Sequence, residues 1–215
     1  ELPGVRGRPF KFVYFGGGTP SYLSAKQLRG LVDRLRDSIG WDDAEEVTFE
    51  CEPGTLNQGK LEAIREIGVT RLSLGVENFN DEILEENGRA HRSPECLEAY
   101  GWARELAFDQ INIDLISGMV GETEENWKDT VRRALELQPE CLTIYQMELP
   151  FNTIYTREGI GGTGAVANWE TKRRWVDYAF GEFKAAGYSQ SSAYTVVRDA
   201  DTKFVYRDAL WEGAD

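Results

Sequence analysis

Short runs of β-branched and aromatic residues alternate along the chain with longer segments in which apolar residues recur every three or four positions. The first pattern is typical of buried strands and the second of amphipathic helices. The strands are predicted at residues 11–15, 46–51, 70–74, 110–116, 142–147 and 188–197. The helices are predicted at residues 24–39, 56–67, 81–86, 93–106, 123–137 and 168–186.

Polar residues at the predicted helix starts support these boundaries. Ser24 is followed three positions later by Gln27, which is the spacing of a capping box. Ser93 precedes Pro94, and proline fits the first turn of a helix because an N–H donor is not needed there. Thr123 is also of a type that is favoured at the N-cap position.

Strand and helix alternate through short connections, and this order predicts a parallel sheet built from right-handed βαβ units. A partial or complete (β/α) barrel and an open, doubly wound sheet both satisfy that order. The sequence has no internal repeat, low-complexity tract or domain linker, and its one glycine-rich insert is predicted as a flexible loop at 153–166. We therefore expect a single α/β domain over residues 1–215.

The charge balance narrows the range of partners. The chain of 215 residues has 24 Lys and Arg against 37 Asp and Glu, so its formal net charge is −13. Such a chain is poorly suited to bind nucleic acid or an anionic membrane surface. It has no apolar stretch of about 18 residues, and residues 1–10 lack the apolar run of a secretory signal. We expect a cytoplasmic protein with no nucleic-acid or membrane partner.

Cysteine and histidine are too sparse for several kinds of site. Cys51, Cys96 and Cys141 are widely spaced, unlike the cysteines of a disulfide framework or a zinc site, and we interpret them as buried thiols. His91 is the single histidine of the sequence, which argues against a histidine metal site or a Ser/His/Asp triad. We therefore assign no metal ligand, and no catalytic residue is identified.

Polar residues gather where the predicted strands end. In parallel α/β folds, ligands bind at the carboxyl ends of the strands. A ring of carboxylates with one arginine suits a small ligand that carries cationic and anionic groups together with hydroxyls. The residues concerned are Gly16, Gly17, Gly18, Thr19, Glu50, Glu77, Asn78, Arg89, His91, Asp114, Gln146 and Glu148.

Other interpretations of these residues stay open. The three glycines are compatible with an ordinary turn, and Arg89 with solvation of the acidic run at 82–86. Asp114 interrupts an apolar strand, and strand alternation places it on the same face as Asn112. An ordinary α/β enzyme with Glu50 and Asp114 as an acid/base pair would use the same positions.

Six short segments in the chain have distinctive sequences. They are residues 14–21 (YFGGGTPS), 49–53 (FECEP), 71–79 (RLSLGVENF), 87–91 (NGRAH), 111–118 (INIDLISG) and 211–215 (WEGAD). Taken together and in this order, they resemble the radical S-adenosylmethionine (SAM) enzymes. Within that family they resemble the oxygen-independent coproporphyrinogen III oxidases.

The resemblance implies a partial (β/α)6 barrel of parallel strands with SAM lying across the strand ends. In the family, a glycine segment contacts the methionine amino group, while acidic residues and an arginine hold the ribose hydroxyls and the methionine carboxylate. An arginine presents a planar fork to a carboxylate, and carboxylates accept hydrogen bonds from a ribose diol. The matching cofactor-binding residues are Gly16, Gly17, Gly18 and Thr19 for the first role, and Glu50, Glu77, Arg89 and Asp114 for the second.

The chain departs from the family pattern at two places. Family members bind a [4Fe–4S] cluster through a CxxxCxxC motif upstream of the glycine segment, and this motif is absent from the sequence. We expect the first barrel strand and the cluster loop to be absent from this chain, which would be a fragment of a longer protein and inactive without them. Residue 77 is Glu where relatives usually have Gln, which adds a negative charge.

The resemblance implies a radical SAM enzyme core that generates a 5′-deoxyadenosyl radical for hydrogen abstraction from an organic substrate, of porphyrin type if it follows the oxidase branch. A radical SAM C-methyltransferase, and a non-catalytic heme chaperone or degenerate cofactor-binding barrel, are the alternatives. Segment 145–153 resembles the chaperone and methyltransferase branches, whereas the His-Asn pair that chaperones often carry before Trp211 is not seen. The implied partners are a small-molecule substrate and a reducing protein such as flavodoxin or ferredoxin.

Overall fold

The computed structural model describes residues 10–37, 39–148 and 166–213. The strands are β1 (Phe12–Phe15), β2 (Glu46–Cys51), β3 (Arg71–Glu77), β4 (Gln110–Ser117), β5 (Cys141–Gln146), β6 (Ser189–Gln190) and β7 (Thr195–Val197). The helices are α1 (Ala25–Arg36), α2 (Gln58–Glu66), α3 (Asp81–Glu86), α4 (Ser93–Glu105), α5 (Glu124–Leu137), α7 (Trp169–Ala185) and α8 (Val205–Trp211), with short 3-10 helices η1 (Pro20–Tyr22) and η2 (Pro53–Thr55).

The chain divides into two compact units. The first combines residues 1–74, 97–111 and 203–215, and the second combines residues 75–96 and 112–202. Strands β3 and β4 and helix α4 therefore each contribute residues to both units. The expectation of one domain over residues 1–215 stays a prediction.

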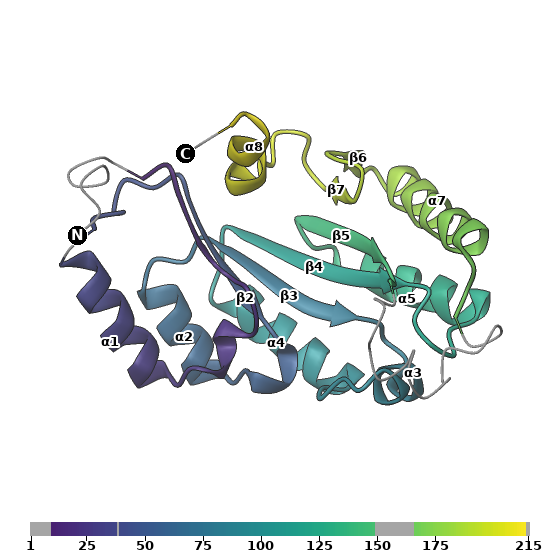
Figure 1. Ribbon diagram of the computed structural model, residues 1–215, viewed down its shortest axis with the longest axis horizontal. Coiled ribbons are helices and arrows are strands. Elements are labelled where there is room, and N and C mark those ends of the chain that lie inside the picture. Colours follow the sequence, from purple (N-terminus) through teal and green to yellow (C-terminus); the bar gives the residue numbers. More distant parts are fainter. Residues whose placement is uncertain (1–9, 38, 149–165, 214–215) are drawn as a thin grey trace. The chain divides into compact units, whose positions relative to one another are not determined.

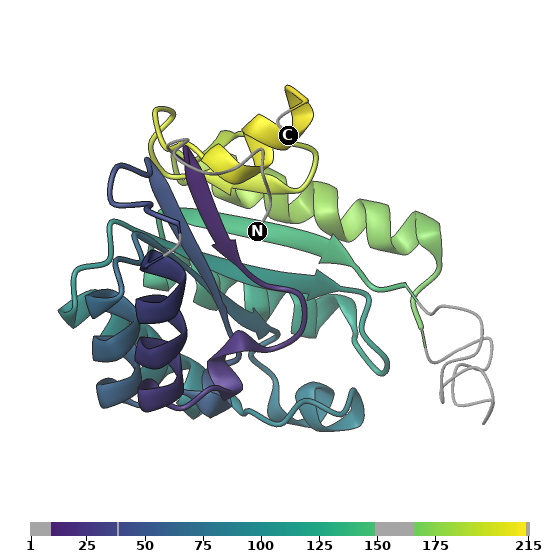
Figure 2. The same ribbon diagram turned by 60° about the vertical axis from the view of Figure 1, so that its left-hand side comes forward.

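Parallel strands form the sheet of the first unit, in the order β1-β2-β3. Tyr14 lies opposite Thr48 in the register, and Glu50 lies opposite Ser73. Helices α1 and α2 pack side by side on one side of these strands, and α8 contacts β1 on the other side (Figures 1 and 2). The inner side chains of this unit are fully buried, among them Leu28, Phe49, Leu61, Ile64 and Leu72.

In the second unit β4 and β5 are parallel neighbours, so the predicted parallel α/β architecture is confirmed. Residues 188–197, however, do not form the single strand that was predicted. They form the short antiparallel pair β6 and β7, and β7 is antiparallel to β5. The cause is a tight turn, in which the N–H groups of Ser191 and Ser192 both donate to the carbonyl oxygen of Thr195.

The predicted helix caps are confirmed. The Ser24 hydroxyl accepts from the Gln27 N–H and the Gln27 side chain accepts from the Ser24 N–H, which makes a capping box. Thr123 forms the equivalent box with Asn126 at the start of α5. Asn80 caps α3 by accepting from two backbone N–H groups.

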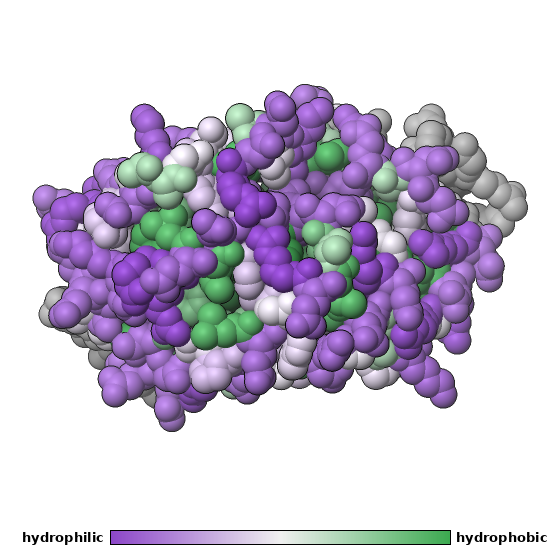
Figure 3. Space-filling model, turned by 180° about the vertical axis from the view of Figure 1, so that it is seen from behind, coloured by the Kyte–Doolittle hydropathy of each residue, from purple (hydrophilic) through white to green (hydrophobic). Residues whose placement is uncertain are grey.

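The three cysteines are internal, and one face of the molecule is mostly polar. Cys51, Cys96 and Cys141 are all buried and none forms a disulfide bond, as predicted. The face drawn in Figure 3 is covered mostly by hydrophilic residues, with hydrophobic residues gathered in a few places. In the described parts of the chain, helices that are long and apolar enough to cross a bilayer are absent. The predicted loop at 153–166 lies almost entirely outside the described residues.

Candidate functional site

The predicted cofactor-binding residues belong to two sets, one in each unit. Gly16, Gly17, Gly18, Thr19 and Glu50 are in the first unit, and Glu77, Arg89 and Asp114 are in the second.

In the first unit, Glu50 at the end of β2 reaches the glycine segment that follows β1. Its Oε2 atom accepts from the Gly17 N–H at 3.3 Å, and its Oε1 atom accepts a short hydrogen bond from the Tyr14 hydroxyl. A Cβ atom on Gly16 would overlap the Tyr14 ring and lie 2.9 Å from the Glu50 carboxylate, so residue 16 has no space for a side chain. The structure thus brings Gly16, Gly17 and Glu50 together, as the sequence predicts for strand ends.

The next two glycines differ from Gly16. Gly17 and Gly18 have φ values of 79° and 117°, in the region that favours glycine, and no atom lies within 4 Å of where a Cβ would be. The space that a side chain would fill is therefore open at both residues. Thr19 ends the segment at the N-cap of η1, where it makes no side-chain capping bond.

In the second unit, Glu77 ends β3 in a left-handed conformation with φ of 65°, which is uncommon for a residue other than glycine. Its carboxylate forms an ion pair with Nε of Arg89. The Glu77 side chain is mostly buried and that of Arg89 is about one-third exposed. Within the acidic run that we considered as the partner of Arg89, Glu85 pairs with Arg92.

Asp114 lies in a polar row on one face of β4 and β5. The Asn112 amide donates to Oδ1 of Asp114 at 2.9 Å, and the Thr143 hydroxyl donates to Oδ1 of Asn112 at 3.0 Å. Ile113 and Leu115 point to the opposite face and are fully buried, which confirms the predicted alternation. Tyr145 is opposite Ile116 and hence shares the face of Asp114.

Glu122 is a buried carboxylate that sequence reasoning did not single out. Its Oε2 accepts from the N–H groups of Gly118 and Met119, and its Oε1 accepts from the Asn78 amide at 2.7 Å. Burial raises the pKa of the Glu122 carboxyl to about 7, against the opposing effect of these hydrogen bonds. Asn78 was noted at the end of its strand, but its partner 44 residues away has no local signal in the sequence.

Tyr14 contacts the predicted site but was not singled out from the sequence, although strand alternation offered a signal. Tyr14 and Gly16 are two positions apart, so strand alternation places them on the same side of the chain. Its hydroxyl bond to Glu50 makes it a neighbour of the predicted site.

None of the described residues assembles a metal centre. Groups of three or more His, Cys, Asp or Glu with suitable spacing do not occur among them. Burial raises the pKa of the Cys51 thiol, which disfavours the thiolate that a metal requires. His91 is buried, and its Nε2 atom lies 3.1 Å from the Val76 carbonyl oxygen, so its ring forms a hydrogen bond with the main chain.

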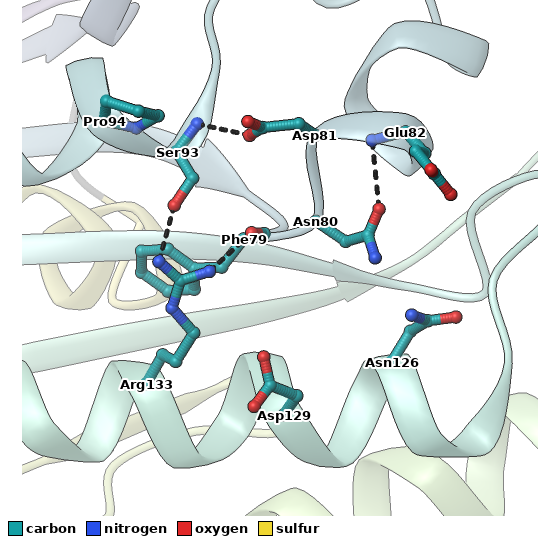
Figure 4. Close-up of a pocket in the computed structure, with 9 residues that line it drawn as sticks. All are labelled: Phe79, Asn80, Asp81, Glu82, Ser93, Pro94, Asn126, Asp129 and Arg133. Carbon is teal, nitrogen blue, oxygen red and sulfur yellow. Dashed lines mark hydrogen bonds between the residues drawn. The ribbon is translucent and has the colours of Figure 1, made fainter.

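The second unit also contains a pocket of about 500 Å³ between the starts of α3 and α4 and one face of α5 (Figure 4). Arg133 crosses it and donates to the Phe79 carbonyl oxygen at 2.6 Å and to the Ser93 hydroxyl at 2.7 Å. Asp81 accepts from the Ser93 N–H at 2.7 Å. None of the predicted cofactor-binding residues lines this pocket, and its arginine is occupied by structural bonds.

Comparison with known proteins places these features in a family. The sequence profile of the radical SAM superfamily matches residues 3–134, which is more than half of the chain. The chain is 32% identical over 151 residues to the heme chaperone HemW of Haemophilus influenzae, covering 70% of this chain and 39% of that protein. It is 33% identical over 145 residues to the oxygen-independent coproporphyrinogen III oxidase of Escherichia coli, covering 67% and 32% of the two chains.

Among solved structures, coproporphyrinogen III oxidase (HemN) of Escherichia coli, described as a radical SAM enzyme, superposes with a TM-score of 0.84 at 27% identity. That match covers 98% of this chain and 48% of the oxidase. The chain spans 39% of the length of the HemW protein of Haemophilus influenzae and 32% of the length of the curated Escherichia coli oxidase. The profile match and the two curated relatives agree, and the chain belongs to the radical SAM superfamily.

Proposed function

We propose that this chain is the SAM-binding core of a radical SAM protein. The observation that carries the proposal is the contact of the Glu50 carboxylate with the Gly17 N–H, at a segment where the Cβ positions of Gly17 and Gly18 have no atom within 4 Å. The family match identifies the class of cofactor, since radical SAM proteins use SAM and a [4Fe–4S] cluster.

The residues present fit the chemistry of SAM. In the first unit, Gly17 and Gly18 leave space for close approach to the backbone, and Glu50 supplies a carboxylate that can accept from hydroxyls. In the second unit, Arg89 supplies a guanidinium for a carboxylate, and Asp114 supplies further acceptor oxygens. The acidic character of both sets also suits a ligand with a positively charged sulfonium.

Each residue is assigned a task in binding rather than in bond breaking. Glu50 and Asp114 would accept hydrogen bonds, Arg89 would pair with the methionine carboxylate, and Glu77 would hold the Arg89 guanidinium in place. SAM and a reduced cluster, when bound, supply the radical that abstracts hydrogen from an organic substrate. The protein's part is to position the cofactor and to keep water away from it.

The [4Fe–4S] cluster does not fit the described residues. The three cysteines are buried separately, and the sequence has no CxxxCxxC motif. Thiolates bind such clusters, and burial opposes ionisation at Cys51. We therefore assign no cluster ligand in this chain and propose that the ligands lie in a segment beyond it, where a reductant such as flavodoxin or ferredoxin would also act.

A pair of exposed tyrosines supports an organic substrate with a flat unsaturated face. The rings of Tyr145 and Tyr194 are stacked with centroids 6.4 Å apart, and 48% and 51% of their surfaces are exposed. Tyr145 shares the strand face that carries Asp114. Stacked aromatic rings are well suited to bind planar groups. A porphyrin-type substrate, as for the oxidase relatives, fits this feature, and so does the substrate of a C-methyltransferase.

Equilibrium dialysis of the chain against SAM tests the proposal. We expect saturable binding by the wild-type chain that weakens at least fivefold in Glu50→Gln and in Asp114→Asn. Glu66→Gln is the matched control, because Glu66 is an exposed carboxylate paired with Arg29 and lies outside both residue sets. Equal binding by wild type, Glu50→Gln and Asp114→Asn would contradict the proposal.

The heme chaperone alternative is favoured by the identity to HemW proteins. It predicts tight binding of heme that is independent of Glu50. Titration of the chain with hemin, followed by the Soret absorption band, separates the two functions. Stoichiometric heme binding together with absent SAM binding would favour the chaperone.

A further inference from the structure

Tyr14 contacts two features of the first unit at once. Its hydroxyl donates to Oε1 of Glu50, the predicted cofactor-binding carboxylate. Its ring is stacked on the ring of Tyr206, with centroids 4.1 Å apart and an interplanar angle of 23°. Tyr206 belongs to α8, the last helix of the described chain. One side chain therefore connects α8 to Glu50.

The start of α8 is held firmly by β2. Glu46 is buried, and its carboxylate accepts from the N–H of Val205 at 2.8 Å and from the N–H of Tyr206 at 3.3 Å. The Thr48 hydroxyl donates to the same carboxylate at 3.0 Å. A carboxylate at a helix N-terminus is favourable because the first N–H groups of the helix lack partners within it.

The residue before α8 is held as well. The guanidinium carbon of Arg71 lies 3.8 Å from the centroid of the Phe204 ring, and Arg71 is buried. Cation–π contacts of this kind are strongest where water is excluded. The position of Tyr206 is therefore fixed by contacts at its own backbone and at Phe204, two residues earlier, in addition to its stack on Tyr14.

We propose that Tyr14 is a positioning residue for cofactor binding, and that α8 holds it in place through Tyr206. The inference rests on the proposed function, in which Glu50 binds SAM. A glutamate has three rotatable side-chain bonds, so a half-buried carboxylate samples several positions unless its oxygens are held. Tyr14 holds Oε1 and the Gly17 N–H contacts Oε2, and acceptor positions on Oε2 are left for a ligand.

The stack explains why a tyrosine in α8 matters to a carboxylate on β2. The Tyr14 hydroxyl reaches Glu50 only when its ring lies in one plane, and the Tyr206 ring fixes that plane. Phe12 supports Tyr206 from a further side by an edge contact at 5.4 Å. The ring of residue 206 is needed in this arrangement, whereas its hydroxyl is not.

The test compares Tyr14→Phe, Tyr206→Leu and Tyr206→Phe by equilibrium dialysis of the chain against SAM. Tyr14→Phe and Tyr206→Leu should each raise the dissociation constant about five- to tenfold, the effect of losing one hydrogen bond to a charged group. Tyr206→Phe keeps the stack, and its dissociation constant should stay within twofold of wild type. Urea unfolding of each variant verifies that it is folded under the dialysis conditions.

A double-mutant cycle identifies the route of the effect. If Tyr14 acts through Glu50, then Tyr14→Phe should change the dissociation constant less than twofold in a chain that already carries Glu50→Gln. An undiminished effect in that background would overturn the inference, and so would wild-type affinity in both Tyr14→Phe and Tyr206→Leu. Failure of the wild-type chain to bind SAM would instead overturn the proposed function, and this inference with it.

Discussion

The Asn78 amide donates a 2.7 Å hydrogen bond to the Glu122 carboxylate, joining the end of β3 to the turn that follows β4. The other side of the Asn78 amide group accepts from the Thr130 hydroxyl at 3.0 Å and from the Asn80 N–H at 2.8 Å. Glu77, the predicted partner of Arg89, is the residue directly before Asn78. The conformation of the predicted site in the second unit therefore depends on a buried polar network next to it.

The stability of the chain should fall as pH rises through the ionisation of Glu122. The pKa of this carboxyl is raised from 4.5 to about 7, so the folded chain holds the proton more tightly than the unfolded chain. Its stabilising contribution is complete below pH 4.5 and is lost by about pH 7. The groups that hydrogen-bond to it are the Asn78 amide and two backbone N–H groups, which do not titrate in this range.

Urea unfolding of wild type and Glu122→Gln at pH 5, 6, 7 and 8 measures this contribution. The unfolding free energy of wild type relative to the variant should decrease by roughly 2–3 kcal/mol across that range. A constant difference at all four pH values would show that the Glu122 pKa is not raised.

Asn78→Ala should destabilise the chain strongly, because it removes three hydrogen bonds and leaves buried partners unsatisfied. The expected loss is about 2–4 kcal/mol in the free energy of unfolding. Asn57→Ala is the control, since Asn57 is an exposed N-cap residue of α2 and its removal should cost only about 1 kcal/mol. Equal losses for the two variants, measured by urea unfolding, would contradict the central role of Asn78.

Gly16→Ala should weaken SAM binding more than it affects folding. The added Cβ would overlap the Tyr14 ring and lie 2.9 Å from the Glu50 carboxylate, so both side chains of this hydrogen-bonded pair would have to move. We expect the dissociation constant for SAM to rise at least fivefold in equilibrium dialysis. Gly30→Ala is the matched control, because Gly30 lies in α1 with no atom near its Cβ position. It should leave binding unchanged and stabilise the chain by about 0.5–1 kcal/mol.

The three cysteines should resist alkylation while the chain is folded. All are buried, and burial also raises the pKa of the Cys51 thiol. Reactivity requires both exposure and thiolate character. Mass spectrometry after iodoacetamide treatment at pH 8 should find no modified cysteine in the native chain and full modification in urea. Rapid modification of native Cys51 would contradict its assignment as an inert core thiol.

The order of strands and helices could be predicted because it depends on local periodicity and on caps. Strand β2 and helix α3 begin and end where the pattern changes, and Ser24 and Thr123 form the capping boxes that their sequences indicate. The shared face of Asn112 and Asp114 also followed directly from strand alternation.

Other features depend on contacts between residues far apart in the sequence. Local sequence patterns do not predict these contacts. Tyr14 and Glu50 are 36 positions apart, and Asn78 and Glu122 are 44 apart. The left-handed conformation of Glu77 has no signal of its own, because the residue is not glycine. The antiparallel pair of β6 and β7 was read as one strand because the turn residues Ser191 and Ser192 lack the usual Gly or Asn.

The carboxylate of Glu46 accepts from residues 159 and 160 positions later in the chain. During synthesis on the ribosome, β1 and β2 are therefore made long before the helix that covers Glu46 and Tyr14. Until that helix is made, the Glu46 carboxylate and the Tyr14 ring are exposed to water or to a chaperone. The closing of such a long loop is slow. Nascent chains stopped just before residue 203 should accordingly keep the second unit protected from proteases while the first remains sensitive.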